Sequence, residues 1–215
     1  MRFEEAVRRL EPLPDVLPQG PPSLVPVFAE SGAPRPRPAW GEADSSTRPA
    51  AVLVLVFPDE EGLARLVLTE RVDRGGHHSG EVSFPGGRAE ATDADLVATA
   101  LREAGEEVAL DVDQAGVQVL GILPVQWIPV SNYQVTPVVA VADRRPLLRA
   151  QPTEVATILE PPLAAFLPQG TLRMVEREIR GWSLRYAAYP VDGLAVWGMT
   201  AMVLGRLGAW LGRPS

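Results

Sequence analysis

The chain has 215 residues, of which 46% are hydrophobic, and its formal net charge at pH 7 is −7. This length and composition allow one sizeable core, and the acidic balance argues against a basic face for nucleic acid, so we expect no nucleic-acid partner. The absence of cysteine excludes disulfides, zinc–thiolate sites and thiol nucleophiles, and because all 20 basic residues are arginine, lysine Schiff-base chemistry is excluded as well. The negative net charge does not exclude a small anionic substrate, because a bound metal ion can make the local electrostatic potential positive.

Two segments bear on location. The N-terminal sequence MRFEEAVRRL lacks the apolar core of a signal peptide, so we expect a cytoplasmic protein. The apolar run Leu194–Leu204 is the membrane candidate, but it is shorter than the ~20 residues that a span needs. We therefore predict no membrane contact and a buried C-terminal helix over 194–211.

Residues 1–49 are predicted to form an N-terminal helix and a Pro-rich lead segment. Phe3, Val7 and Leu10 recur at i, i+4 and i+7, which indicates a short amphipathic helix. Ten of the 22 prolines precede residue 50, and residues 11–49 show no periodicity, so we expect an irregular, partly extended chain. An exposed arm of this kind needs a surface to lie on, and on that ground we expect a homodimer.

Strand and helix patterns follow one another over 50–212, which we predict to be one domain. The apolar run 51–57 indicates a strand buried on both faces, and with 64–71 it predicts a hairpin. Further strands are expected at 81–84 (ended by the Pro-Gly-Gly of 85–87), 117–125 and 133–142, with a short helical stretch over 152–167 and a late hairpin at 171–178 and 182–191. This order predicts an α/β fold, an α/β/α sandwich with a mixed β-sheet.

The helix predicted over 95–108 carries the glutamates Glu103, Glu106 and Glu107 within five positions. Its core stripe is Val97, Leu101, Ala104 and Val108. Glu103 and Glu107 are like charges at i and i+4, and they lie near the helix C-terminus, where the dipole disfavours anions. Arg102, one turn before Glu106, is expected to offset one charge only. The cluster is either a solvated acidic face or a site for a hard divalent cation, which prefers oxygen ligands.

The segment GGRAEATDADLVATALREAGEEVAL (86–110) resembles the Nudix box, G-x5-E-x7-R-E-U-x-E-E-x-G-U, in which U is apolar. This box is the signature of hydrolases that cleave a nucleoside diphosphate linked to another group. The matching residues are Gly87, Arg102, Glu103, Ala104, Glu106, Glu107 and Leu110. The chain departs from the pattern at the first acid, which is Asp93 with eight residues before Arg102, and at Ala109, which replaces a glycine.

The longer spacing and an upstream motif resemble one branch of the family, the coenzyme A diphosphatases. The branch motif is L-T-x-R … H-x-G-E-V-S-F-P-G-G, and the matching residues are Leu68, Thr69, Arg71, His78 and 80–87. Where the branch commonly carries Leu-Arg, this chain has Gly75 and Gly76, so the anion contact expected there falls to Arg74. The sequence VWGMTAMVL also resembles a late helix start that is typical of the branch.

The resemblance implies a Nudix hydrolase domain over 50–212 that splits coenzyme A into 3′,5′-ADP and 4′-phosphopantetheine. It implies that Mg²⁺ or Mn²⁺ is held by Glu103, Glu107, Glu106 and the Gly87 carbonyl, and that Arg102 orients a glutamate through a bidentate pair. The substrate contacts that it implies are Arg71, Arg74, His78, Glu81 and Ser83. The general base stays open between Glu106, Glu81 and Glu154.

Two other functions fit the same motifs. One is hydrolysis of another nucleoside diphosphate derivative, such as a nucleotide sugar, ADP-ribose or a dinucleoside polyphosphate. The other is a non-catalytic nucleotide-binding regulator, which the presence of all three glutamates disfavours. Trp127, Trp182 and Tyr133 are candidates for stacking on adenine, although aromatic residues at such positions more often belong to the core.

Overall fold

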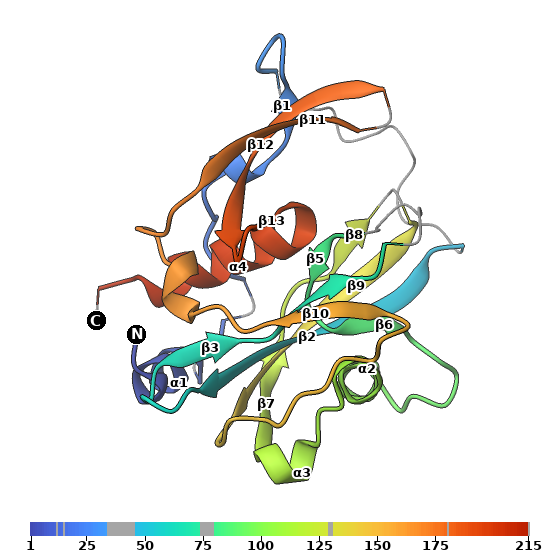
Figure 1. Cartoon of the computed structure of the whole chain (residues 1–215), viewed down its shortest axis with the longest axis vertical. Helices are drawn as coiled ribbons and strands as arrows, with labels where there is room; N and C mark the ends of the chain where they lie inside the picture. The colour runs from blue at the N-terminus through green and yellow to red at the C-terminus, as the bar shows by residue number, and fades with distance from the viewer. Residues whose placement is uncertain are drawn as a thin grey trace.

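The computed structural model of the chain describes residues 1–11, 13–14, 16–33, 46–73, 80–128, 131–179 and 181–214. Within these residues, a six-stranded sheet, two smaller sheets and flanking helices form the fold (Figure 1). Helix α2 (Leu96–Val108) covers one face of the six-stranded sheet, and helix α4 (Gly198–Leu211) lies on the other side of it. The predicted α/β architecture with helices on both sides is confirmed.

The six-stranded sheet is mixed, as predicted. Its order is β3-β2-β9-β7, with β6 also paired to β2 and β8 to β9. The bounds are β2 Arg48–Pro58, β3 Ala64–Leu66, β6 Gly86–Arg88, β7 Val117–Ile122, β8 Gln126–Ile128 and β9 Tyr133–Ala142. Strands β2 and β9 run parallel, whereas their other partners are antiparallel. Both are buried along most of their length, as continuous apolar runs indicate.

Two antiparallel sheets complete the framework. One has the order β10-β4-β5, with β4 at Leu68–Arg71, β5 at Val82–Ser83 and β10 at Val155–Leu159. The other, called here the small sheet, has the order β1-β12-β11 with β13 paired to β12. Its bounds are β1 Val27–Phe28, β11 Arg173–Ile179, β12 Trp182–Val191 and β13 Leu194–Val196. The short helices are α1 Phe3–Leu10, α3 Val112–Ala115 and the 3₁₀ turns η1 Pro22–Leu24 and η2 Leu163–Phe166.

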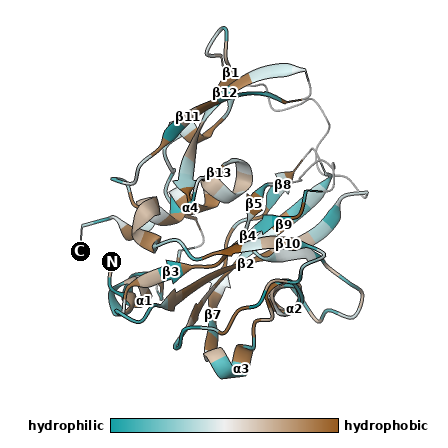
Figure 2. Ribbon diagram, in the orientation of Figure 1, coloured by the Kyte–Doolittle hydropathy of each residue, from teal (hydrophilic) through white to brown (hydrophobic). Residues whose placement is uncertain are grey.

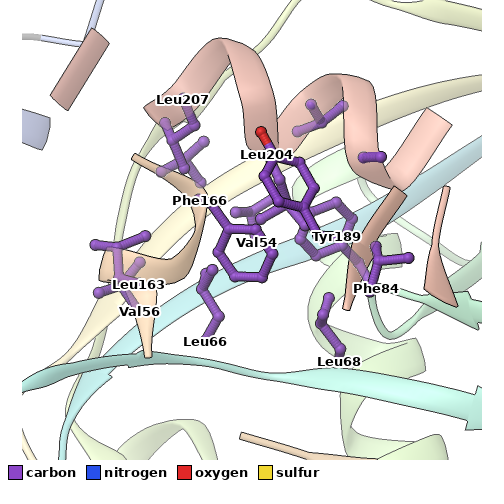
Figure 3. Close-up of a cluster of buried hydrophobic side chains, with 14 of the residues drawn as sticks. Val54, Val56, Leu66, Leu68, Phe84, Leu163, Phe166, Tyr189, Leu204 and Leu207 are labelled. Atoms are coloured by element: carbon purple, nitrogen blue, oxygen red, sulfur yellow. The ribbon is translucent and has the colours of Figure 1, made fainter. Parts of the chain in front are cut away.

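Alternation along β2 divides the core into two clusters. Leu53 and Leu55 face α2, whereas Val54 and Val56 face the cluster that contains α4. Figure 3 shows the second cluster, in which Tyr189 of β12 lies among side chains from β2, η2 and α4. The central strands are accordingly hydrophobic in Figure 2. The six-stranded sheet is therefore covered on both sides, and hydrophobic packing fixes the position of α2 on it.

The N-terminal residues contribute to this core. Leu10, Leu17 and Leu24 are buried in the same cluster as α4. The Arg9 guanidinium donates to the carbonyl of Leu211 at the end of α4, and the Arg9 carbonyl accepts from the indole of Trp210 at 2.8 Å. The described part of the lead segment thus lies on its own chain, which removes the reason given above for a homodimer through an exposed arm.

Several element predictions are confirmed and four are wrong. The helices at α1 and α2, the buried strands β2 and β9, and the β11–β12 hairpin are confirmed. The 152–167 segment is not helical: β10 pairs with β4, because its β-branched residues suit a strand, and a helical turn begins only after Pro162. The C-terminal helix begins at Gly198, since Leu194–Val196 turns back as β13 onto β12.

The two remaining errors lie close to the glutamates. The predicted strand 64–71 divides at Val67, so that β3 pairs with β2 while β4 leaves to pair with β10 and β5. Gly86 and Gly87 do not end a strand; they continue as β6, which pairs with β2. No helix in the described part of the chain is long and apolar enough to cross a membrane.

Replacing Ala109 by glycine should stabilise the protein. Ala109 ends α2 with φ 54° and ψ 37°, a left-handed conformation that costs an L side chain about 1 kcal/mol relative to glycine. We expect Ala109→Gly to raise the melting temperature by about 2–4 °C in thermal unfolding. The matched control is Ala98→Gly within the same helix, which should lower it, because glycine is unfavourable in a helix interior. A fall in both variants would contradict this account of the helix end.

Candidate active site

Helix α2 begins and ends where the sequence indicates. Asp95 caps its N-terminus, and the Asp95 carboxylate accepts from the backbone N–H of Ala98 at 2.8 Å. The three glutamates on its last turns then face different surroundings. The side chain of Glu107 is 3% exposed, that of Glu103 15% and that of Glu106 60%. The helix therefore turns two carboxylates toward the sheet and leaves the third at the surface.

Glu107 is a buried carboxylate with few partners. It accepts a hydrogen bond from the backbone N–H of Gly86 at 3.0 Å, and a guanidinium nitrogen of Arg71 lies 3.6 Å from its other oxygen. Burial raises the pKa of Glu107 to about 7, against the lowering effects of these two groups. Burial also raises the pKa of Glu103, although the adjacent Arg102 opposes the shift.

Two glycines in β6 make room for these carboxylates. A side chain at Gly86, where φ is 153°, would place its Cβ 2.3 Å from the carbonyl oxygen of Ala51. A Cβ at Gly87 would lie 2.6 Å from the Glu103 carboxylate. Only glycine lets β6 pair with β2 and approach α2 this closely. Both glycines are thus explained by packing, Gly86 against β2 and Gly87 against Glu103.

Arg102 holds several acidic groups together. Its guanidinium forms a bidentate pair with Asp93, at 2.9 and 3.1 Å, and reaches Glu106 at 3.0 Å and Glu103 at 3.1 Å. It also donates to the carbonyl of Arg88 at 3.0 Å. The Arg102 guanidinium holds the pKa of the Asp93 carboxyl well below its usual range. The prediction that Arg102 offsets one charge only is therefore wrong, and its bidentate partner is Asp93, not a glutamate.

A fourth acid lies close to the buried pair. Glu154 stands in the turn before β10, and its backbone carbonyl accepts from the N–H of Val72. The charge of Glu154 raises the pKa of both Glu103 and Glu107. Glu154 is thus a turn residue next to the site and does not lie on the surface helix that its sequence context suggested.

The acidic pair fits a divalent cation in its chemistry. Glu107 is buried and Glu103 is partly buried, and both are repelled by each other and by Glu154, so a positive ion would stabilise their ionised forms. Oxygen ligands of this kind suit Mg²⁺ or Mn²⁺. Among the residues that the structure describes, no three His, Asp or Glu side chains are gathered in a ready chelating group. Glu106 instead turns to Arg102, and the predicted three-glutamate ligand set, with the Gly87 carbonyl, stays a prediction.

Of the predicted substrate contacts, the structure places Arg71 beside Glu107. Arg71 ends β4 next to Glu107, and its backbone N–H donates to the carbonyl of Glu81 at 3.1 Å. Ser83 of β5 lies opposite Thr69, with 3.5 Å between the hydroxyls. Arg74 and His78 lie outside the described residues.

The aromatic candidates are spread over the molecule. Trp127 donates its indole N–H to the side chain of Asn132 at 3.3 Å, and the ring of Tyr133 lies 4.2 Å from the Arg48 guanidinium. Trp182 is 53% exposed and lies on the small sheet. Sequence reasoning missed the Asp93–Arg102 pair and the Gly86 donor. The unusual position of Asp93 in the motif was a signal for the Asp93–Arg102 pair. The Gly86 donor is a backbone N–H, which no residue type in the sequence indicates.

Comparisons with known proteins identify relatives of this chain. A family model described as the NUDIX domain matches residues 47–183. The "Uncharacterized Nudix hydrolase NudL" of Salmonella paratyphi B is 39% identical over 176 residues, covering 82% of this chain and 89% of that protein, and the Salmonella typhimurium protein of that name gives the same values.

Among solved structures, a MutT/nudix family protein from Enterococcus faecalis is 14% identical with a TM-score of 0.49, covering 76% of this chain and 61% of its own. The Nudix hydrolase RenU from M. smegmatis is 21% identical with a TM-score of 0.46, covering 55% and 73%. On the strength of the matched family model and the NudL relatives, this chain belongs to the Nudix hydrolase family.

Proposed function

We propose that this Nudix hydrolase cleaves the diphosphate linkage of coenzyme A and its derivatives, giving 3′,5′-ADP and 4′-phosphopantetheine. One observation carries the proposal: the upstream motif and the Nudix box meet at Glu107. Arg71 belongs to the motif that resembles the coenzyme A branch, and its guanidinium lies 3.6 Å from Glu107. Gly86 is near the end of the same motif, and its backbone N–H donates to the Glu107 carboxylate. A single diphosphate at this point would contact residues of both motifs.

The proposed roles follow from the surroundings of each residue. Glu103 and Glu107 would hold Mg²⁺ or Mn²⁺, with Glu106 and the Gly87 carbonyl as further proposed ligands. When bound, the ion supplies charge neutralisation for the diphosphate and lowers the pKa of a bound water. Arg102 would keep the end of α2 in place through Asp93, so that the two buried carboxylates keep their orientation. The proposed substrate contacts are Arg71, Arg74, His78, Glu81 and Ser83.

Of the acids considered as general base, Glu154 is favoured by its position. The Glu106 carboxylate is 60% exposed and lies 3.0 Å from Arg102. The charge of Glu154 raises the pKa of both Glu103 and Glu107, which places Glu154 near both carboxylates. We therefore propose Glu154 ahead of Glu106 for this role.

A substrate panel tests the proposed reaction. With Mg²⁺ or Mn²⁺, coenzyme A should be cleaved with a kcat/KM at least about tenfold above that for ADP-ribose, a nucleotide sugar or a dinucleoside polyphosphate, a difference of about 1.4 kcal/mol in transition-state binding. Mass spectrometry of products formed in heavy-oxygen water reports turnover, the bond cleaved and the phosphorus attacked. Faster cleavage of ADP-ribose than of coenzyme A would remove coenzyme A as the substrate while leaving a Nudix hydrolase.

Substitution of the buried glutamates tests their role. Glu103→Gln and Glu107→Gln should each lower kcat by about 100-fold or more, because each removes a proposed metal ligand. Circular dichroism should show the fold intact, since loss of a like charge at i and i+4 does not weaken a helix. Glu60→Gln, which changes an 88% exposed carboxylate in the β2–β3 turn, is the control and should keep full activity. Near-normal kcat in both site variants at saturating metal would contradict the ligand assignment.

The buried charge also makes stability depend on pH and metal. Burial raises the pKa of Glu107 from 4.5 to about 7. The contribution of Glu107 to the free energy of unfolding is therefore highest below pH 4.5, where Glu107 is protonated in both states, and it falls as pH rises from 4.5 to about 7. In metal-free buffer at pH 8, Glu107→Gln should therefore be more stable than the unmodified chain by about 1–3 kcal/mol. The two should converge near pH 4.5 in urea unfolding.

Metal should make the unmodified chain more stable than Glu107→Gln at pH 8, the opposite of the order in metal-free buffer. Mn²⁺ binds the folded form and should raise the melting temperature of the unmodified chain, but only weakly that of Glu107→Gln. Glu106→Gln serves as the comparison, because its carboxylate is 60% exposed and its removal should change metal-free stability by less than ~1 kcal/mol. Equal metal responses in the unmodified chain and Glu107→Gln would show that the ion binds elsewhere.

A further inference from the structure

One face of the small sheet gathers aromatic rings around a single guanidinium. The strand register places Arg177 and Phe28 on either side of Leu184, and Trp182 and Tyr186 lie two residues before and after Leu184 on the same strand. Because side chains alternate along a strand, these groups share one face. We call it the aromatic face, made of Phe28, Arg177, Trp182, Leu184 and Tyr186, with Trp197 stacked on Tyr186.

The exposed members of the aromatic face are Trp182 and Arg177, whereas Leu184 and Tyr186 are buried, at 0% and 1% exposed. The alternate residues of β12, Ala187 and Tyr189, belong to the core cluster that contains α4. Phe28 and Trp182 contact each other at 5.2 Å between ring centroids, and Trp182 is 53% exposed. An exposed indole supported from behind by another ring is a platform on which a base can stack.

Arg177 gives this face a positive charge. The residue is exposed, and within the described part of the chain no carboxylate lies within ion-pairing distance of its guanidinium. Burial raises the pKa of the Tyr186 phenol, and the charge and hydrogen-bonding of Arg177 oppose that rise, which places the guanidinium beside the phenol. A guanidinium held against an aromatic surface with no carboxylate partner is suited to a phosphate group.

The aromatic face is connected to the glutamate site through β5. Glu81, directly before β5, lies close enough to Tyr186 for its charge to act on the phenol. Its carbonyl accepts from the backbone N–H of Arg71, whose side chain reaches Glu107. Strand β5 also packs against β13 of the small sheet. Strand β5 is therefore in contact both with β4, which carries Arg71, and with the small sheet.

We propose that the aromatic face binds the nucleoside end of the substrate, with Trp182 stacking on the purine and Arg177 binding a phosphate on the ribose, outside the diphosphate that is cleaved. This inference rests on the proposed function for its ligand, because coenzyme A carries such a ribose phosphate, whereas its dephospho form and ADP-ribose do not. Arg177 is thus a specificity-determining residue of the same site.

The test compares ligands that differ only in the ribose phosphate. Binding of 3′,5′-ADP and of 5′-AMP to the full chain is measured by titration calorimetry for the unmodified chain, Arg177→Gln and Arg185→Gln. Arg177→Gln should weaken 3′,5′-ADP about tenfold and leave 5′-AMP unchanged. Arg185→Gln, which removes the same charge from the opposite face of β12, should change neither affinity. Trp182→Leu should weaken both nucleotides by a similar factor.

Kinetics with coenzyme A and its dephospho form separate this inference from the proposed function. The unmodified chain should prefer coenzyme A in kcat/KM, and Arg177→Gln should abolish most of that preference by raising KM with kcat little changed. If coenzyme A is cleaved but Arg177→Gln keeps the full preference, the inference is wrong and the proposed function stands. If coenzyme A is not cleaved, yet 3′,5′-ADP binds through Arg177, the proposed reaction fails and the binding face stands. Equal binding of 3′,5′-ADP and 5′-AMP by the unmodified chain would overturn the inference directly.

Discussion

The burial of one carboxylate determines the local structure around the site. Glu107 is 3% exposed, and the contacts of its carboxylate among the described residues are one backbone N–H and a guanidinium at 3.6 Å, too few to offset the loss of hydration. The folded chain therefore keeps Glu107 ionised at neutral pH only with difficulty, as its raised pKa shows. A proton or a cation relieves this cost, and repulsion from Glu103 and Glu154 increases the preference for a cation of higher charge.

The same constraint explains why the neighbouring residues have their particular types. Gly86 and Gly87 have no side chain because β6 must reach both β2 and the glutamates. Arg102 is the obvious counter-ion for the pair, yet its guanidinium is held in a bidentate contact with Asp93. Arg102 also reaches Glu103 at 3.1 Å, whereas the Glu107 carboxylate lies 3.6 Å from the guanidinium of Arg71. Glu107 therefore has a longer arginine contact than either Asp93 or Glu103.

Local patterns predicted much of the fold but not the different surroundings of the three glutamates. The stripe on α2 and the apolar runs of β2 and β9 are governed by periodicity, so the sequence indicates them well. β10 was missed because its strand character depends on pairing with β4, a partner distant in sequence. Likewise, the different exposures of Glu103, Glu106 and Glu107 depend on where the sheet lies under α2, which charge spacing alone does not determine.

The N-terminal segment shows how residues far from the motif support the site. Strand β1 pairs with one edge of β12, which leaves β11 as the outer strand of the small sheet. β11 carries alternating charges at Glu176, Arg177 and Glu178, and charged residues on an outer strand oppose pairing with another chain. The outer strand thus stays open, and the guanidinium on its aromatic face stays accessible. Since Phe28 of β1 also supports the Trp182 ring, the lead segment contributes directly to the surface proposed to bind substrate.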